Sequence, residues 1–179
     1  MQLHPMTAAE RPALRDLYRK AFPACERKSW SALERLQKQG RAEILTIDEA
    51  GFAGLMITLR GEGLVLLDYF AVSPNRRGGG IGEGALAALR QRCAPLPLCL
   101  EIEDCAESGA PNITQRRRRR AFYLRCGMIP TAKMHIYDTD MELLATDSGV
   151  TFEGYRALLS RALGGWFTDA HLRPLPQTK

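Results

Sequence analysis

The sequence predicts an α+β domain built on one mixed, mostly antiparallel central sheet. Three apolar runs, at 42–48, 52–59 and 64–72, are separated by short turns that contain glycine, as in consecutive antiparallel strands. A helical pattern then separates the third run from a further apolar run at 98–104, and a helix in that place is typical of a parallel crossover. Strands of both orientations together with helices define the α+β class.

Local signals place the other elements. Thr7 and Glu10 have the spacing of a capping box, which predicts a first helix, and Ser31 and Glu34 repeat that spacing before a second helix that Gly40 ends. The expected elements are, in order, a short strand at 1–5, helices at 7–21 and 31–39, strands at 42–48, 52–59 and 64–72, a helix at 82–93, a strand at 98–104, a helix at 114–126, a hairpin of 134–138 and 141–146 that turns at Thr139 and Asp140, a helix at 152–163 and an irregular tail from Trp166.

Composition is that of an ordinary globular protein. The chain has 179 residues, of which 45% are hydrophobic and 25% charged, and this length suits one domain with a sizeable core. We expect residues 1–146 to form the main domain and the helix and tail at 147–179 to pack on it. No apolar run reaches the ~18 residues of a membrane span, and the first residues lack the pattern of a signal peptide.

The cysteines predict a reducing compartment. Their number, five, is odd, and none forms a Cys-x-x-Cys pair. This pattern favours free thiols over a disulfide framework or a zinc site. The histidines likewise show no spacing typical of metal ligands. We therefore expect a cytoplasmic protein without a metal.

The most specific signal is the glycine-rich stretch that joins the strand at 64–72 to the helix at 82–93. Its residues run Arg77-Gly78-Gly79-Gly80-Ile81-Gly82. A loop of this kind can point several backbone N–H groups into one small space, provided that no side chains fill it. Together with the positive end of the following helix, these amides predict an anion site, and phosphate is the expected guest.

The P-loop and the dinucleotide-binding loop are two glycine-rich loops that bind phosphate, and neither pattern fits residues 77–82 well. A P-loop requires Gly-Lys-Ser/Thr, and no lysine or hydroxyl stands near Gly82. The dinucleotide fingerprint fits Gly78 and Gly80 loosely and finds acidic residues near 101–103, but its strand would come too late in the chain for an opening Rossmann unit. A glycine-rich hairpin or helix cap without a ligand is a further alternative.

The spacing of Val72, Arg77, Gly80 and Gly82 resembles the acyl-CoA-binding motif of the GNAT superfamily of N-acyltransferases, which is Arg/Gln-x-x-Gly-x-Gly/Ala after a strand that ends in valine. The resemblance runs over residues 1–146. It implies the GNAT fold, with helices on both faces of the sheet and a parallel strand pair that splays apart. It also implies acetyl-CoA as the co-substrate, with the pantetheine arm bonded by the backbone of Phe70, Ala71 and Val72, and the pyrophosphate held by the amides of Arg77, Gly78, Gly79, Gly80, Ile81, Gly82 and Glu83.

A second match supplies a candidate acid. The segment Phe122-Tyr123 followed by Gly127 resembles the family's Phe-Tyr-x-x-x-Gly-Phe, in which the tyrosine lies at the end of the pantetheine arm. Attack of an amine on a thioester expels a thiolate, and a tyrosine can protonate it. Met128 replaces the usual phenylalanine, and Cys126 stands where asparagine is common. A core aromatic residue on an amphipathic helix is the alternative interpretation of Tyr123.

A base is sought among the carboxylates, because an amine acceptor is mostly protonated at neutral pH. Glu101 and Glu103 lie two residues apart and therefore on one face of the strand at 98–104. We expect Glu101 to be the base, and Glu103 to contact the substrate or to replace Glu101 as the base. The same is expected of Glu26, because Phe22-Pro23-Ala-Cys-Glu26-Arg27 resembles a segment near the N-terminus of some bacterial GNAT proteins. A solvated edge of the sheet is the alternative. These acids slightly favour a cationic acceptor such as a polyamine, an amino sugar or a lysine-like amine.

Five consecutive arginines, 116–120, raise the question of nucleic acid. On a helix they spread over all faces, so they form no single basic stripe. Arg116, Arg119 and Arg120 share the face of Tyr123 and could contact phosphates or an acidic substrate, whereas Arg117 and Arg118 are expected to face water. A solvated charge run is the plainest interpretation, and nucleic acid is not the partner that we expect.

The sequence thus predicts a transferase that moves an acetyl group from acetyl-CoA to a primary amine of a small molecule or peptide by direct attack. No serine or cysteine stands beside a base, so no covalent enzyme intermediate is expected. We expect a monomer or homodimer. An acyl-CoA-binding sensor or scaffold without turnover, and a basic nucleic-acid-binding module, are the competing hypotheses.

Overall fold

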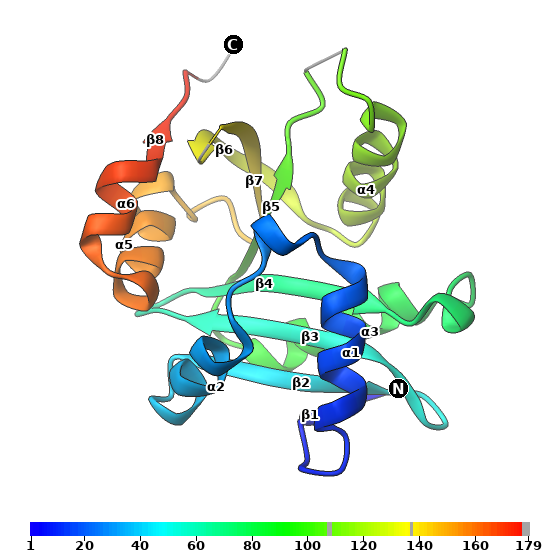
Figure 1. Cartoon of the computed structure of the whole chain (residues 1–179). Helices are drawn as coiled ribbons and strands as arrows, with labels where there is room; N and C mark the ends of the chain where they lie inside the picture. Colours follow the sequence, from blue (N-terminus) through cyan, green and yellow to red (C-terminus); the bar gives the residue numbers. More distant parts are fainter. Residues whose placement is uncertain (107–108, 137, 177–179) are drawn as a thin grey trace. The chain divides into compact units, whose positions relative to one another are not determined.

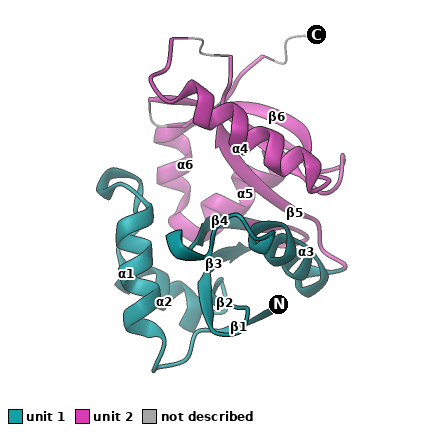
Figure 2. Ribbon diagram, turned by 90° about the vertical axis from the view of Figure 1, so that its right-hand side faces the viewer, with its two compact units in different colours: residues 1–60, 67–94 teal, residues 61–66, 95–179 magenta. Residues whose placement is uncertain are grey.

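The structure is a computed structural model of the 179-residue chain, and it describes residues 1–106, 109–136 and 138–176 (Figure 1). The chain divides into two compact units, which Figure 2 colours separately. Unit 1 comprises residues 1–60 and 67–94, and unit 2 comprises residues 61–66 and 95–179. None of the helices among the described residues is long and apolar enough to cross a membrane.

Unit 1 contains the strand order β1-β2-β3-β4. Its elements are β1 (Gln2–Pro5), α1 (Arg11–Ala21), the short 3-10 helix η1 (Ala24–Glu26), α2 (Trp30–Lys38), β2 (Ala42–Asp48), β3 (Phe52–Arg60), most of β4 (Val65–Val72), the 3-10 helix η2 (Pro74–Arg76) and α3 (Ile81–Cys93). In this unit α1 and α2 lie in front of the strands in Figure 1 and α3 lies behind them, so helices cover both faces.

Aromatic and aliphatic side chains of α1 and α2 form the core of unit 1 against β2, β3 and β4. Tyr18 is central to it, because its ring packs edge-on against Trp30 and Tyr69, with ring centroids 5.6 Å and 4.9 Å away. Such edge-to-face pairs contribute about 0.5–1.5 kcal/mol each beyond the area that they bury. Tyr69 and Ala71 of β4 belong to this core, which fixes one face of β4 against the helices.

Unit 2 contains β5, β7, β6 and β8 in that spatial order, with the first residues of β4 beside β5. Its elements are β5 (Leu98–Glu103), α4 (Ile113–Arg125), β6 (Ile129–Ile136), β7 (Thr139–Ala145), α5 (Phe152–Leu163), α6 (Gly165–His171) and β8 (Leu172–Pro174). Within this unit α4 packs against β5, α5 packs against β6, and α6 packs against α5.

The predicted sheet is confirmed, including its single parallel pair. Val65 and Leu66 of β4 pair in parallel with Leu98 and Cys99 of β5. The β1–β2, β2–β3, β5–β7, β6–β7 and β6–β8 pairs are antiparallel. Val65 and Leu66 of β4 belong to unit 2 with β5, whereas residues 67–72 belong to unit 1.

The start of the second helix was predicted wrongly. Ser29, not Ser31, is the N-cap of α2, and its Oγ accepts the N–H of Ala32 at 3.2 Å. Glu34 does not complete a capping box, because its carboxylate binds the guanidinium of Arg11 at 2.6 Å. The Thr7–Glu10 hydrogen bonds do form, at 2.8–2.9 Å, but in the turn that precedes α1.

Two further predictions are corrected near the C-terminus. Thr139 and Asp140 belong to β7, where Thr139 pairs with Ile136 and Asp140 with His135, so the hairpin turns before them. The tail from Trp166 is not irregular, since it contains α6 and β8. Strand β8 pairs with β6, from Ile136–Leu172 to Met134–Pro174. The boundary between a main domain at 1–146 and a packed segment at 147–179 stays a prediction, and residues 147–176 lie with β5–β7 in unit 2.

We predict that Gly54→Ala destabilises unit 1 by about 1–3 kcal/mol, because a Cβ at this position of β3 would lie 2.4 Å from the carbonyl oxygen of Ala71 and 3.1 Å from the Cα of Val72. Both of these are backbone atoms of β4 that cannot rotate away. Denaturant-induced unfolding measures the change. Gly79→Ala is the matched control, because a Cβ there meets no heavy atom within 4 Å. Equal stability of the two variants would contradict the close approach of β3 to β4.

Candidate functional site

The chain leaves β4 at a fixed point. The N–H of Ser73 donates to the carbonyl oxygen of Ala53 in β3 at 2.8 Å, immediately after Val72. The turn η2 follows, in which the N–H of Arg76 donates to the carbonyl oxygen of Ser73 at 2.9 Å. The side chain of Arg76 also donates to the carbonyl oxygen of Glu49, in the turn between β2 and β3. The glycine-rich loop therefore starts from an anchored segment.

Two of the glycines are required by the backbone itself. Gly78 and Gly80 have φ angles of 89° and 75°, in the left-handed region that other residues adopt at a cost. Gly80 is the N-cap of α3, and the first hydrogen bond within this helix runs from the N–H of Gly84 to the carbonyl oxygen of Gly80 at 3.0 Å. The amides of Ile81 and Gly82 consequently have no acceptor within the helix. They lie at its positive end, where an anion is stabilised.

Gly79 is explained in a different way. It has no positive φ, and a Cβ on Gly78, Gly79 or Gly80 would meet no heavy atom of the protein within 4 Å. Crowding by neighbouring protein atoms is therefore not what requires glycine at these positions. A side chain at Gly79 would instead project into the space over the loop, so glycine keeps this backbone accessible. The residues present fit a phosphate group approaching the loop amides.

The charge beside the loop is positive. The Nε of Arg77 donates to the carbonyl oxygen of Val72 at 3.1 Å, which folds the exposed Arg77 side chain back over the end of β4. Phe70 and Val72 are half-buried and alternate with the buried Ala71 of the α1–α2 core. All the residues predicted to bind the co-substrate, from Phe70 to Glu83, lie in unit 1.

Tyr123 lies on α4 of unit 2 and is partly buried. Its ring packs edge-on against Phe122, with the centroids 5.1 Å apart. Burial raises the pKa of Tyr123 to about 12, although the positive charge of Arg119 opposes that increase. The hydroxyl is therefore protonated at neutral pH and can donate a proton or a hydrogen bond.

Glu101 and Glu103 have different surroundings in unit 2. The carboxylate of Glu101 accepts the hydroxyl of Tyr155, a fully buried residue of α5. The carboxylate of Glu103 accepts hydrogen bonds from Asn112 at 2.9 Å and from Arg119 at 3.0 Å, and it forms an ion pair with Arg116 at 3.1 Å. Sequence reasoning missed Tyr155, since no local pattern relates α5 to β5.

The arginine run is mostly paired within the chain. Arg116 is buried and binds Asn112, the carbonyl oxygen of Asp104 and Glu103. Arg120 donates twice to Glu142, at 2.6 Å and 3.1 Å. Arg117 and Arg118 are exposed, as predicted. The run thus ties α4 to β5 and β7 with charge-assisted hydrogen bonds.

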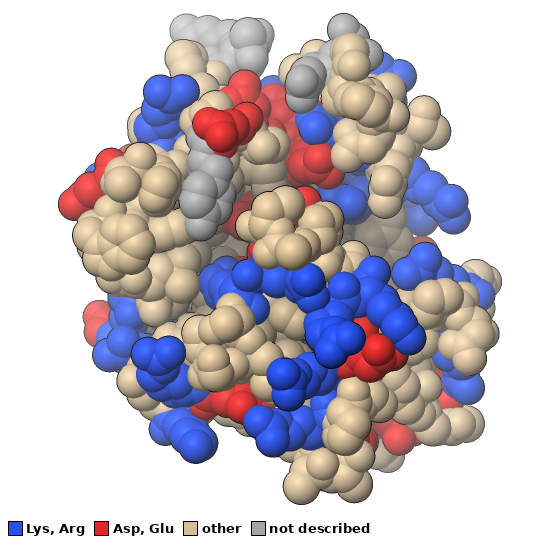
Figure 3. Space-filling view, in the orientation of Figure 1, with Lys and Arg blue, Asp and Glu red and all other residues tan. Residues whose placement is uncertain are grey.

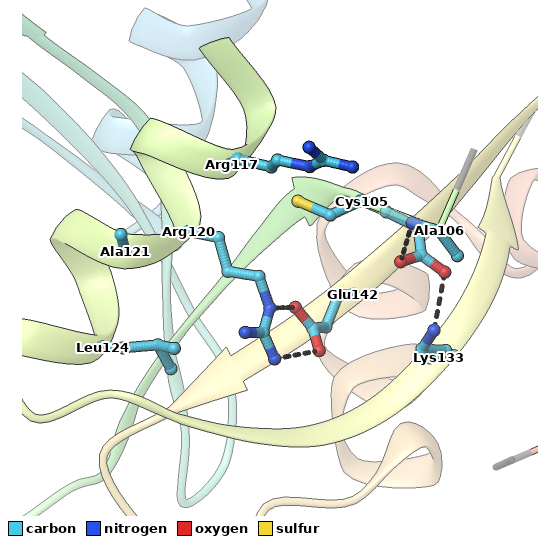
Figure 4. Close-up of a pocket in the computed structure, with 9 residues that line it drawn as sticks. Cys105, Ala106, Arg117, Arg120, Ala121, Leu124, Lys133 and Glu142 are labelled. Carbon is cyan, nitrogen blue, oxygen red and sulfur yellow. Dashed lines mark hydrogen bonds and ion pairs between the residues drawn. The ribbon is translucent and has the colours of Figure 1, made fainter. Parts of the chain in front are cut away.

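A pocket of about 400 Å³ opens in unit 2 between α4 and the strands β6 and β7 (Figure 4). Four of its five charged residues form two pairs, Arg120–Glu142 and Lys133–Asp104, the second at 2.8 Å, and the fifth is the exposed Arg117. Cys105 also lines it, and burial raises the pKa of its thiol. Arg120, a possible phosphate or substrate contact from the sequence, lines this pocket, but none of the predicted catalytic or co-substrate-binding residues does. Among the described residues no cluster of three or more metal-ligating side chains is present.

Glu26 and Asp68 belong to unit 1. Glu26 is exposed at the end of η1, and its carbonyl oxygen accepts the hydroxyl of Tyr69 at 2.8 Å. Asp68 lies two residues before Phe70 on β4, with its side chain only 5% exposed, and it pairs with the ammonium of Lys28 at 2.8 Å.

Comparison with known proteins identifies the fold. No protein-family model matches the chain. A Bacillus subtilis protein named "Putative acetyltransferase YjbC" is 32% identical over 104 residues, which are 58% of this chain and 50% of that protein. The chain therefore matches about half the length of this curated relative.

Two solved structures are similar in fold to this chain. One is a GNAT-family protein of Bacteroides thetaiotaomicron, 22% identical, with a TM-score of 0.75 over 92% of this chain and 99% of the other. Another is an aminoglycoside 6'-N-acetyltransferase complexed with coenzyme A, 17% identical, with a TM-score of 0.60 over 81% of this chain and 96% of the other. These likenesses confirm the predicted GNAT fold.

Proposed function

We propose that this chain is an N-acetyltransferase that transfers an acetyl group from acetyl-CoA to a primary amine by direct attack. The observation that carries the proposal is the loop after β4, whose left-handed Gly78 and Gly80 start α3 with its amide end open. The GNAT fold supports it, because this loop has the Arg-x-x-Gly-x-Gly spacing that such acyltransferases use.

The co-substrate would be held by unit 1. The amides of Arg77–Glu83 would bind its pyrophosphate, with Arg77 beside them, and the backbone of Phe70–Val72 would bind the pantetheine arm like an added strand. When bound, acetyl-CoA supplies an activated acyl group as a thioester.

Tyr123 is the proposed acid. A hydroxyl whose pKa is about 12 keeps its proton at neutral pH and can deliver it to a departing thiolate. The free thiol then leaves, and the hydroxyl is reprotonated from solvent. Because amine attack is direct, this role needs no covalent intermediate on the enzyme.

Glu101 is the proposed base, and Tyr155 is its positioning residue. A hydrogen bond donated to a carboxylate favours the charged form, which is the form that accepts a proton from an ammonium group. Glu103 and Glu26 are the proposed substrate contacts. Of these two, the exposed Glu26 is the more accessible, since the carboxylate of Glu103 is engaged by α4.

The proposed acceptor is a primary amine, and the surface charge of the protein indicates which other charged groups this amine carries. Lysine and arginine side chains gather over α1 and α2 on the face drawn in Figure 3. Residues 11–38 contain eight of these residues against three acidic ones. Glu103, one of the acids that favour a cationic acceptor, accepts a hydrogen bond from Arg119 of α4. The positive α1–α2 surface supports an amine that also carries an anionic group.

The test is an acetyl-transfer assay with acetyl-CoA and an amine panel that contains polyamines, amino sugars, amino acids and acidic peptides. Release of free thiol and the mass of the product are both recorded. Acetylated product supports an enzyme. An acyl-CoA sensor would bind acetyl-CoA and form no product, whereas a nucleic-acid module would bind DNA or RNA in a salt-sensitive manner and ignore acetyl-CoA. The cytoplasmic location and the monomer or homodimer state stay predictions.

We predict that Tyr123→Phe lowers kcat by about 10²-fold, since a positioned acid contributes about 10²–10⁴-fold to a rate. The Kd for coenzyme A should stay within about twofold, because the predicted binding groups lie elsewhere. Steady-state kinetics and calorimetric titration measure the two quantities. Arg118→Gln, an exposed substitution on the same helix, is the control and should leave both unchanged. An unchanged kcat in Tyr123→Phe would exclude Tyr123 as the acid.

We further predict that Tyr155→Phe moves the acid limb of the kcat/KM profile to higher pH by about one unit, because a lost hydrogen bond to a charged group raises the pKa of the carboxylate by about that amount. The sign follows from Glu101 acting in its charged form, so a higher pKa delays its deprotonation. The pH profile of the variant measures this shift. A lower rate with an unmoved profile would indicate that Tyr155 supports only the packing of α5.

A further inference from the structure

The Lys28 side chain lies against β4. Its Nζ is 2.8 Å from Oδ1 of Asp68 and 5.2 Å from the centroid of the Tyr69 ring. Asp68 and Tyr69 are successive residues of β4. An ammonium group is thereby held against this strand.

The backbone at Lys28 is held on both sides. The hydroxyl of Tyr69 accepts the N–H of Lys28 at 3.0 Å and donates to the carbonyl oxygen of Glu26 at 2.8 Å. The hydroxyl of Tyr18 donates to the carbonyl oxygen of Lys28 at 3.0 Å. Both tyrosines are buried in the core of unit 1. The backbone between η1 and α2 is therefore held in one position, and the Lys28 side chain extends from it to Asp68.

That place is at the acyl end of the proposed co-substrate site, and this step rests on the proposed function. If the loop at 77–83 holds the pyrophosphate and Phe70–Val72 hold the arm, the arm runs along β4 against the chain direction. The next residue toward its far end on the same face is Asp68, one two-residue step of about 7 Å from Phe70. The Lys28 amine and the thioester would then meet beside Asp68.

We propose that Lys28 is an acetylation site of this protein, modified by its own bound acetyl-CoA. The Lys28 ammonium gives one proton to the Asp68 carboxylate, whose Oδ2 is buried with no hydrogen-bond partner among the described residues. The free amine attacks the thioester carbonyl carbon, forming a C–N bond as the C–S bond breaks. The second nitrogen proton leaves with the sulfur, so the products are acetyl-Lys28, free coenzyme A thiol and one proton passed from Asp68 to solvent.

The test incubates the purified chain with acetyl-CoA and follows acetylation by intact mass and peptide mapping. Lys20 is the internal control, because it also pairs with an aspartate, Asp16 at 2.7 Å, but its side chain is 73% exposed against 22% for Lys28. Uncatalysed acetylation favours the exposed lysine. We expect Lys28 to be modified at least about tenfold faster than Lys20, at a rate independent of protein concentration.

Two measurements separate this inference from the proposed function. The melting temperature is recorded with and without coenzyme A, which does not acetylate. A raised melting temperature with Lys28 modified no faster than Lys20 overturns the inference and leaves the proposed function standing. No rise with either coenzyme A or acetyl-CoA overturns both. Lys28→Arg should abolish the selective modification, and Asp68→Asn should slow it while Lys20 is unaffected. Acetylation of Lys28 that accelerates with protein concentration would also contradict reaction within one chain.

Discussion

The position of strand β4 is the constraint on which the proposed site depends. One face of β4 is fixed by the aromatic core around Tyr18 and Tyr69, and its backbone lies so close to β3 that only glycine fits at position 54. The Ser73–Ala53 hydrogen bond then sets where the strand stops. As a result the glycine-rich loop begins at a defined point, and the amide end of α3 is held beside the last residues of β4.

Charge in unit 2 is organised differently from what a run of arginines suggests in isolation. Arg116 and Arg119 converge on Glu103, and Arg120 binds Glu142. These contacts join α4 to the sheet. Removal of one partner from such a partly buried pair destabilises the protein, because the other charge is left unpaired. The carboxylate of Glu101, also on β5, accepts the hydroxyl of Tyr155.

Most of the fold could be predicted because its signals are local. Glycine turns, the crossover helix and the loop spacing placed the strands and the motif within a few residues. The errors lie where contacts between residues distant in the sequence determine the local structure. Glu34 binds Arg11 rather than capping α2, β8 exists through its pairing with β6, and Tyr155 meets Glu101 across 54 positions of sequence. The Lys28–Asp68 pair joins residues 40 apart and was equally invisible to periodicity.

The central claim is that the loop after β4 binds the phosphates of coenzyme A. Residue-resolved amide hydrogen exchange, with and without saturating coenzyme A, tests it most directly. The account predicts slower exchange at the amides of Ile81 and Gly82 and along Phe70–Val72, because these groups would become hydrogen-bonded to the ligand. Protection confined to α4 and its arginines, with Ile81 and Gly82 unchanged, would contradict it.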